Sequence, residues 1–125
     1  MIRRALDSNW LSAGLRIGFF LALVAVGILA LMPVPPPLPG AESDKIQHFA
    51  AFFVLAVLGA SAFRRHTCLL VFGIMAFGAM LELLQGTALI ARDMSAYDWL
   101  ADVAGTAIGA FSAAVLFRAS PLPSI

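Results

Sequence analysis

Four long apolar stretches, separated by short polar or proline-containing segments, dominate this sequence. They run over residues 15–32, 46–63, 67–91 and 98–117. The hydrocarbon core of a bilayer is about 30 Å thick and needs roughly 20 helical residues to cross it, and each stretch is close to that length. Short connections make consecutive helices antiparallel neighbours. The pattern predicts an all-α membrane protein, one domain over residues 1–125, built as a four-transmembrane-helix bundle.

Composition agrees with a membrane protein and excludes some soluble classes. Of 125 residues, 62% are hydrophobic and 12% are charged, whereas about a quarter are charged in soluble domains. A bilayer is therefore the expected partner, because lipid solvates apolar surface that water would not. The net charge of +1, without clustered basic residues, excludes a nucleic-acid partner. The single cysteine, Cys68, cannot form an intrachain disulfide, and we expect it to pack as a small hydrophobe.

The first stretch, residues 15–32, has two possible fates. Arg3 and Arg4 precede it, as in a secretory signal peptide. Its apolar core is longer than that of a usual signal, and no small-x-small cleavage site follows. We expect a retained helix, followed by a stiff extended connection over residues 33–39, where closely spaced prolines cannot continue a helix.

Basic residues predict the orientation in the membrane. Six of the eight lie in regions that would share one side, and two lie in regions on the other. The six are Arg3, Arg4, Arg16, Arg64, Arg65 and Arg118, and the two are Lys45 and Arg92. Lysine and arginine favour cytoplasmic flanks, so both termini are expected in the cytoplasm (N-in/C-in). In a bacterium this would be a multi-pass inner-membrane protein.

Polar residues that are costly in a membrane occur at the expected outer ends of three different helices. They are Asp44, Lys45, His48, Glu82, Gln85, Arg92, Asp93, Asp98 and Asp102. Ionisable residues in membrane helices usually face the bundle interior or a wet cavity. We therefore expect one connected polar cluster just below the outer surface. Glu82 should lie two to three turns inside its helix end, with Arg92 folded over the acids.

Glycines predict which face of the last helix points inward. Asp98, Asp102, Gly105 and Gly109 fall on one stripe, and the two glycines form a GxxxG pattern that lets a neighbouring helix approach closely. This packing role for Gly105 and Gly109 would turn both aspartates inward. We place Ala113 off the stripe and expect Ala113→Leu to be milder than Gly105→Leu or Gly109→Leu.

Some of the polar residues have a purely structural alternative. Asp44 suits helix capping, and Ser95 with Asp98 forms an S-x-x-D helix start. Lys45 suits snorkelling to lipid headgroups, and His48 could simply be a structural partner of Asp44.

The remaining residues have different alternatives. Gln85 could only link helices, and Arg92 could be a loop charge. Glu82 and Asp102 do not sit at helix caps. Their main structural alternative is an ion pair with Arg92 or Lys45.

Three motifs in this order resemble VanZ-like membrane proteins. Residues 44–49 (Asp-Lys-Ile-Gln-His-Phe) resemble a D-K-x-x-H-F signature, and residues 82–85 match E-x-x-Q. Arg92 followed by residues 98–109 matches R…D-x-x-x-[N/D]-x-x-G-x-x-x-G. One departure is Asp102, where better-known members carry asparagine. The resemblance implies a bacterial inner-membrane protein in a family named for a member that confers resistance to teicoplanin, a lipoglycopeptide acting outside the membrane.

The cluster predicts binding of, or action on, a lipid-linked or cell-envelope substrate at the outer leaflet, such as a lipid-linked cell-wall precursor. Lys45 and Arg92 could hold a phosphate, while the acids and His48 orient it or transfer protons.

Two alternatives remain. The first is an intramembrane acid/base enzyme, whose candidate catalytic residues are His48, Glu82, Asp98 and Asp102. The second is a non-catalytic helper or scaffold, in which the buried polar network is structural. The sequence has no nucleotide loop and no H-E-x-x-H motif, so no cofactor is predicted. With one plausible histidine ligand, no metal site is predicted either.

Overall fold

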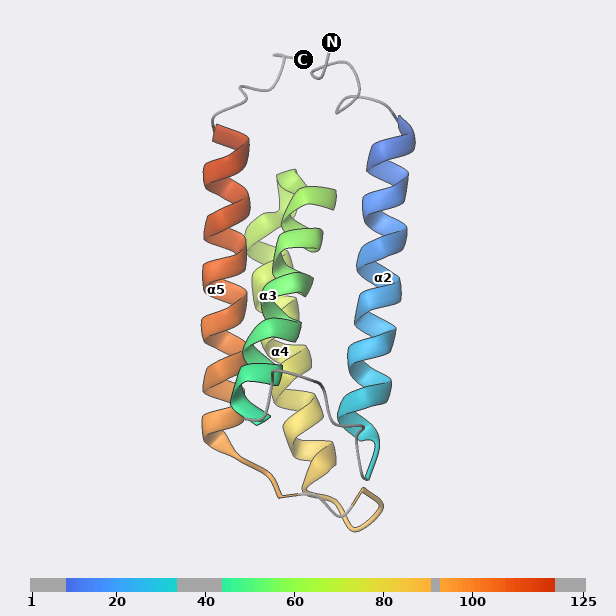
Figure 1. Cartoon of the computed structure of the whole chain (residues 1–125), viewed down its shortest axis with the longest axis vertical. Coiled ribbons are helices and arrows are strands. Elements are labelled where there is room, and N and C mark those ends of the chain that lie inside the picture. Colours follow the sequence, from blue (N-terminus) through green and yellow to red (C-terminus); the bar gives the residue numbers. More distant parts are fainter. Residues whose placement is uncertain (1–8, 34–43, 91–92, 119–125) are drawn as a thin grey trace.

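The chain folds into four long helices that run side by side (Figure 1). The structure, a computed structural model, describes residues 9–33, 44–90 and 93–118. The helices are α2 (Asn9–Leu31), α3 (Asp44–Ala62), α4 (Thr67–Gln85) and α5 (Ala96–Arg118), with a short 3₁₀ helix, η1 (Arg64–His66), between α3 and α4. All four long helices in this part of the chain are apolar and long enough to cross a membrane. The predicted all-α fold with four membrane-spanning helices is therefore confirmed.

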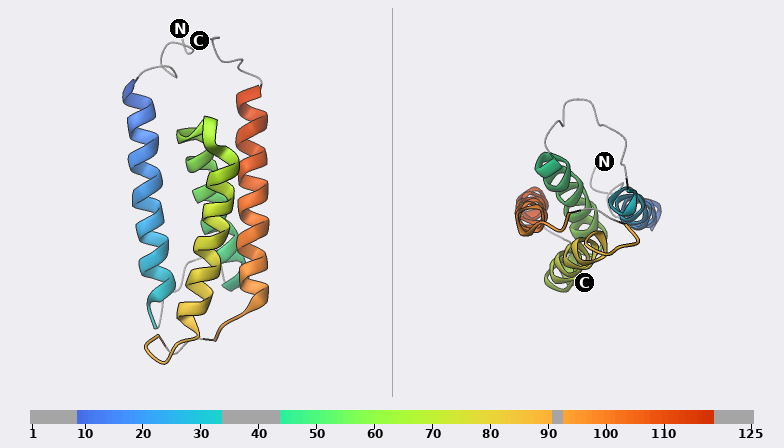
Figure 2. Two further views of the ribbon diagram at one scale, coloured as in Figure 1. Left: turned by 180° about the vertical axis from the view of Figure 1, so that it is seen from behind. Right: turned by 90° about the horizontal axis from the view of Figure 1, so that it is seen from below.

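Consecutive helices alternate in direction, which gives the bundle two chemically different ends (Figures 1 and 2). At one end lie the start of α2, η1 and the end of α5; we call this the η1 end. At the other lie the starts of α3 and α5 and the ends of α2 and α4; we call this the polar end. The view along the bundle shows α3 between α2 and α5 (Figure 2).

The closest helix contact joins α5 to α3 at two glycines. A Cβ atom added to Gly105 would overlap the carbonyl oxygen of Phe49, and one added to Gly109 would lie 2.6 Å from the carbonyl oxygen of Phe53. Only a residue without a side chain lets two backbones approach in this way. The GxxxG stripe therefore lies on the α3–α5 interface, and the face of α5 that carries it points into the bundle.

The hydrophobic core is small and lies around α3. Its buried members are Phe19, Phe52, Leu55, Ala56, Ile74 and Leu81. Of the α2 side chains that the structure describes, only Phe19 is buried. Large apolar side chains elsewhere point outward on all four helices. An outer surface of this kind is solvated by lipid, so these helices imply contact with a bilayer.

Helix α4 ends before its apolar stretch, which continues to residue 91, because the backbone turns there. The Gly86 N–H donates to the carbonyl of Glu82 at 3.2 Å, and both the N–H and the hydroxyl of Thr87 donate to the carbonyl of Leu84. These bonds tighten and close the last turn. The prediction that Glu82 lies two to three turns inside the helix end is wrong, since Glu82 belongs to the last turn.

Three further predictions are wrong. Helix α2 begins at Asn9 rather than residue 15, because residues 9–14 contain no proline and continue the helix beyond the apolar run. Ala113 lies on the glycine stripe rather than off it. It is 1% exposed, because a position four residues after Gly109 returns to the same helix face. Cys68 is exposed, since it lies on the outward face of the first turn of α4.

Candidate functional site

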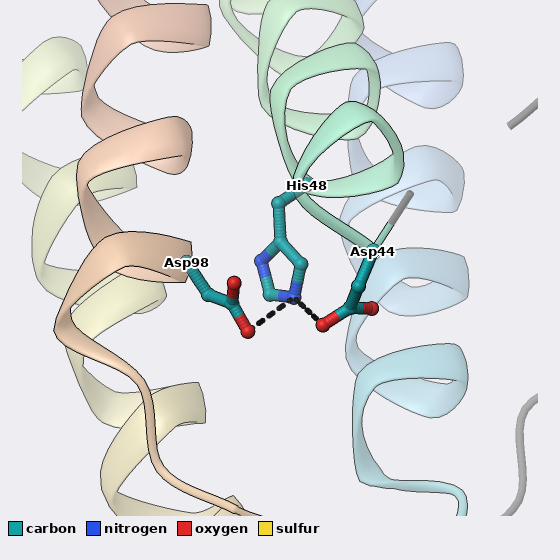
Figure 3. A group of neighbouring side chains, drawn as sticks. All are labelled: Asp44, His48 and Asp98. Atoms are coloured by element: carbon teal, nitrogen blue, oxygen red, sulfur yellow. Dashed lines mark ion pairs between the residues drawn. The ribbon is translucent and has the colours of Figure 1, made fainter. Parts of the chain in front are cut away.

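His48 is the centre of the polar end of the bundle. It lies one turn into α3, and its side chain is 12% exposed. Its Nδ1 lies 2.7 Å from Asp102 Oδ1 and 3.8 Å from Glu82 Oε1. Its Nε2 faces Asp44 Oδ2 at 3.8 Å and Asp98 Oδ2 at 3.9 Å (Figure 3). Helices α3, α4 and α5 thus all contribute acids to one imidazole. We call Asp44, Lys45, His48, Glu82, Asp98 and Asp102 the His48 cluster.

The contact between His48 and Asp102 fixes the orientation of the ring. When Asp102 is ionised, its carboxylate can only accept, so Nδ1 then carries the hydrogen and donates it. Asp102 is held in place by its surroundings: it is 0% exposed, and a Cβ atom added to Gly78 of α4 would lie 2.9 Å from its Oδ2. The carboxylate is therefore enclosed between α3 and α4, and it leaves Nε2 of His48 directed at Asp44 and Asp98.

The Asp98 carboxylate faces the cluster because Glu82, rather than Asp98, accepts the N–H of Ser95. In a capping box, the acid at the third helical position reaches back to the N–H of the capping residue. Here the N–H of Ser95, which precedes α5, instead donates to Glu82 Oε2 at 3.1 Å. Ser95 still caps the helix, since its hydroxyl accepts the Asp98 N–H at 3.3 Å. The Asp98 carboxylate is thus turned toward Lys45, whose Nζ lies 3.2 Å from Oδ1.

The cluster gathers three buried carboxyl groups, those of Glu82, Asp98 and Asp102, around one imidazole. Glu82 is 4% exposed, and neither its Oε1 nor Oδ2 of Asp102 has a hydrogen-bond partner in the described part of the chain. The carboxyl groups of Glu82, Asp98 and Asp102 are all buried and lie beside His48 or Lys45. Buried charge without a partner costs several kcal/mol. The interior of the cluster therefore favours a cation or a hydrogen-bond donor over an anion, whereas Lys45 at its edge suits an anion.

One edge of the cluster is accessible from outside the bundle. The side chains of Lys45 and Asp44 are 57% and 48% exposed, whereas that of Asp98 is 7% exposed. A ligand approaching this edge would meet a flexible ammonium group and a carboxylate before it reached His48.

No protein-family model, curated protein or solved structure matches this chain. The four helices make it an integral membrane protein. Any narrower function has to be argued from the chemistry of the His48 cluster.

Gln85, a predicted site residue, does not join the His48 cluster, and Arg92, another, is not among the described residues. The Gln85 amide donates from Nε2 to the carbonyl of Ala30 in α2 at 2.8 Å. Carbonyls in the last turn of a helix lack partners within it, so Gln85 joins α4 to the end of α2. This favours the helix-linking interpretation of Gln85 over substrate binding. Arg92 lies outside the described residues, and its position over the acids stays a prediction.

The structure also adds residues that the sequence did not single out. Gly78 admits the Asp102 carboxylate, and the hydroxyl of Thr106 donates to the Asp102 carbonyl at 2.7 Å. Trp99 Nε1 donates to the Met75 carbonyl at 3.2 Å, which joins α5 to α4. Gly78 had one detectable signal, since it lies one turn before Glu82 on the same helix face.

Proposed function

We propose that this integral membrane protein is VanZ-like, and that its His48 cluster binds a lipid-linked or cell-envelope substrate at the outer leaflet of a bacterial inner membrane. The observation that carries the proposal is the convergence of three helices on His48. The family resemblance supports it, because two of the three motifs, residues 44–49 and 98–109, supply residues to this cluster, and Glu82 opens the third.

The chemistry of the accessible edge suits the headgroup of such a substrate. Lys45 is an exposed point charge beside buried carboxylates, and lysine binds phosphate as a compact cation. The acceptors Asp44 and Asp98 lie next to it and suit hydroxyl or amine groups. A substrate anchored in the outer leaflet by its apolar tail would present a headgroup at this depth.

Charge at the opposite end supports the proposed orientation. Arg64 and Arg65 form most of η1, and the Arg16 guanidinium lies over the Phe63 ring, 5.5 Å from its centre. Three arginines thus mark the η1 end, whereas Lys45 belongs to the polar end. Following the positive-inside tendency, both termini are cytoplasmic and the polar end faces outward.

The orientation is tested with two single-cysteine proteins in a Cys68→Ser background. His66→Cys lies at the η1 end and Met94→Cys at the polar end, and both positions are exposed. In intact spheroplasts, a membrane-impermeant maleimide should label the Met94→Cys protein and should reach the His66→Cys protein only after permeabilisation. The reverse pattern would put the cluster on the cytoplasmic side and would exclude an outer-leaflet substrate.

Substrate binding is tested by native mass spectrometry of the purified protein. We expect a phosphate-bearing lipid to co-purify with the native chain and with Arg65→Gln, the control at the η1 end. The same lipid should be lost from Lys45→Gln. An identical lipid profile for all three proteins would mean that only bulk lipid is bound, and the proposal would be wrong.

A second candidate function is acid/base catalysis in the membrane, and the 2.7 Å contact between His48 and Asp102 favours it. A carboxylate that holds an imidazole in one orientation is the usual support for a general base. Cells would be scored for sensitivity to an envelope-targeting lipoglycopeptide. If cells with the His48→Gln variant are as sensitive as cells without the protein, and the folded variant keeps its lipid, catalysis is favoured over binding. If no cluster variant changes it, the non-catalytic helper is favoured.

A further inference from the structure

We propose that the His48 cluster is a binding site for one divalent transition-metal ion, coordinated by His48 Nε2, Asp44 Oδ2 and Asp98 Oδ2 (Figure 3). This goes beyond substrate binding and stands or falls separately from it. It also departs from the sequence-based expectation of no metal, which rested on counting histidines. The structure adds the arrangement of carboxylates around the one histidine.

The distances between the three groups are those of ligands rather than of hydrogen-bonded partners. Nε2 lies 3.8 Å from the Asp44 oxygen and 3.9 Å from the Asp98 oxygen, and all three atoms lie within 4.8 Å of one another. Both nitrogen–oxygen distances are too long for a hydrogen bond. Ligands at about 2.1 Å from a tetrahedral ion lie about 3.4 Å apart, so the two nitrogen–oxygen distances would shorten by about 0.4–0.5 Å on binding.

The groups behind the ligands orient them for a metal. A histidine that binds a metal usually donates its other ring N–H to a carboxylate. His48 does so through Nδ1 to Asp102, at 2.7 Å. Asp98 is oriented in the same manner, because Lys45 binds its Oδ1 and leaves Oδ2 facing His48.

Buried carboxyl groups behind the imidazole also favour a cation beside it. Oε1 of Glu82 and Oδ2 of Asp102 are buried without a hydrogen-bond partner among the described residues. Both side chains lie against the imidazole from the side opposite Asp44 and Asp98. A divalent ion on Nε2, in place of a proton, would bring one further positive charge to these buried carboxyl groups. A protonated His48 alone leaves both distances to Nε2 too long for good hydrogen bonds.

The donor set indicates which ions would bind. One imidazole nitrogen with two carboxylate oxygens suits Zn²⁺ or Mn²⁺, whereas Mg²⁺ prefers an all-oxygen, largely hydrated shell. The exposed side of Asp44 keeps further coordination positions open to water or to a phosphate oxygen. A phosphate bound there would also lie near Lys45.

The test uses the full-length chain in detergent after treatment with a chelator. Mn²⁺ binding is followed by electron paramagnetic resonance, and Zn²⁺ binding by isothermal titration, in a Cys68→Ser, His66→Gln background that removes thiol and imidazole ligands at the η1 end. We expect one saturable ion per chain, with Mg²⁺ binding at least tenfold weaker. Asp98→Asn and Asp44→Asn should each weaken Mn²⁺ binding at least tenfold, and Asp102→Asn should weaken it by roughly 10–100-fold.

Folding of each variant is checked by gel filtration and thermal unfolding. Asp44→Asn keeps the test decisive, since Asp44 is half exposed and its change should not unfold the chain. Absence of one-to-one binding in the folded native background would overturn the proposal. So would Mn²⁺ binding that depends on Glu82 but not on Asp44, because the ion would then lie on the Nδ1 side. If the native chain binds Mn²⁺ one-to-one but carries no phosphate-bearing lipid, the substrate proposal alone fails.

Discussion

Replacing Gly109 by alanine should destabilise the bundle, although alanine is the better helix former. The added Cβ would lie 2.6 Å from the carbonyl oxygen of Phe53 and 2.9 Å from the Cβ of Ala56. An ordinary carbon–oxygen contact needs roughly 3.3 Å, and a backbone carbonyl cannot rotate away, so α5 must shift from α3 by about 0.7 Å. Overpacking of this kind costs about 1–3 kcal/mol, more than the gain of up to about 1 kcal/mol in helix propensity.

The same shift should weaken the polar cluster. The hydrogen bond between His48 and Asp102 crosses the same α3–α5 interface, at 2.7 Å. Lengthening it by about 0.7 Å would take it past the roughly 3.2 Å limit of a good hydrogen bond. Gly109→Ala is therefore expected to lower metal or substrate affinity although it touches neither ligand.

Thermal unfolding of the purified protein in one detergent measures the effect. Gly73→Ala in α4 is the matched control, because its Cβ would meet no atom within 4 Å. We expect a lower midpoint for Gly109→Ala and an unchanged or slightly higher one for Gly73→Ala. Equal midpoints for the two variants would refute the argument that backbone contact at Gly109 holds α5 to α3.

Three other predictions concern single contacts. Gln85→Leu should lose the bond to the Ala30 carbonyl and lower the free energy of unfolding by about 0.6–1.7 kcal/mol, the range for hydrogen bonds between membrane helices, as measured by thermal unfolding. Cys68 should react stoichiometrically with a maleimide in the folded, detergent-solubilised protein, whereas reaction only on unfolding would contradict its exposed position. Gly78→Ala should displace the Asp102 carboxylate and reproduce the phenotype of an Asp102 variant, scored by lipoglycopeptide sensitivity, while the protein still inserts in the membrane.

The four helices could be predicted from the sequence because a membrane-spanning helix needs a long apolar stretch. Such a stretch is visible in the local composition of the chain. The end of α4 could not be read from hydrophobicity, since Leu89 and Ile90 are apolar yet follow the turn made by Gly86 and Thr87. Gly86 was the signal in the sequence. Apolar residues lie on both sides of it, so hydrophobicity alone continues through the turn.

The partners within the site were harder to predict because they depend on how separate helices meet. The S-x-x-D start of α5 predicts that Asp98 caps its own helix. Glu82 takes the Ser95 N–H instead, and it can do so only because the end of α4 lies beside the start of α5. No spacing along the chain encodes that proximity. The side chains that are costly in a membrane could be identified from sequence, but which of them pair could not.

The close pairing of α3 with α5 has a consequence for how the protein enters the membrane. These two are the less hydrophobic of the four spans, and α3 carries Asp44, Lys45 and His48 at its leading end. Because α3 is synthesised well before α5, it must leave the translocon before its main partner exists. The ribosome still has to make α4, which is strongly apolar, and then α5 with Asp102. During that interval, α2 is the earlier span in the described part of the chain that can cover α3. Helix α2, which also packs against α3 in the finished bundle, would then cover α3 until α5 arrives.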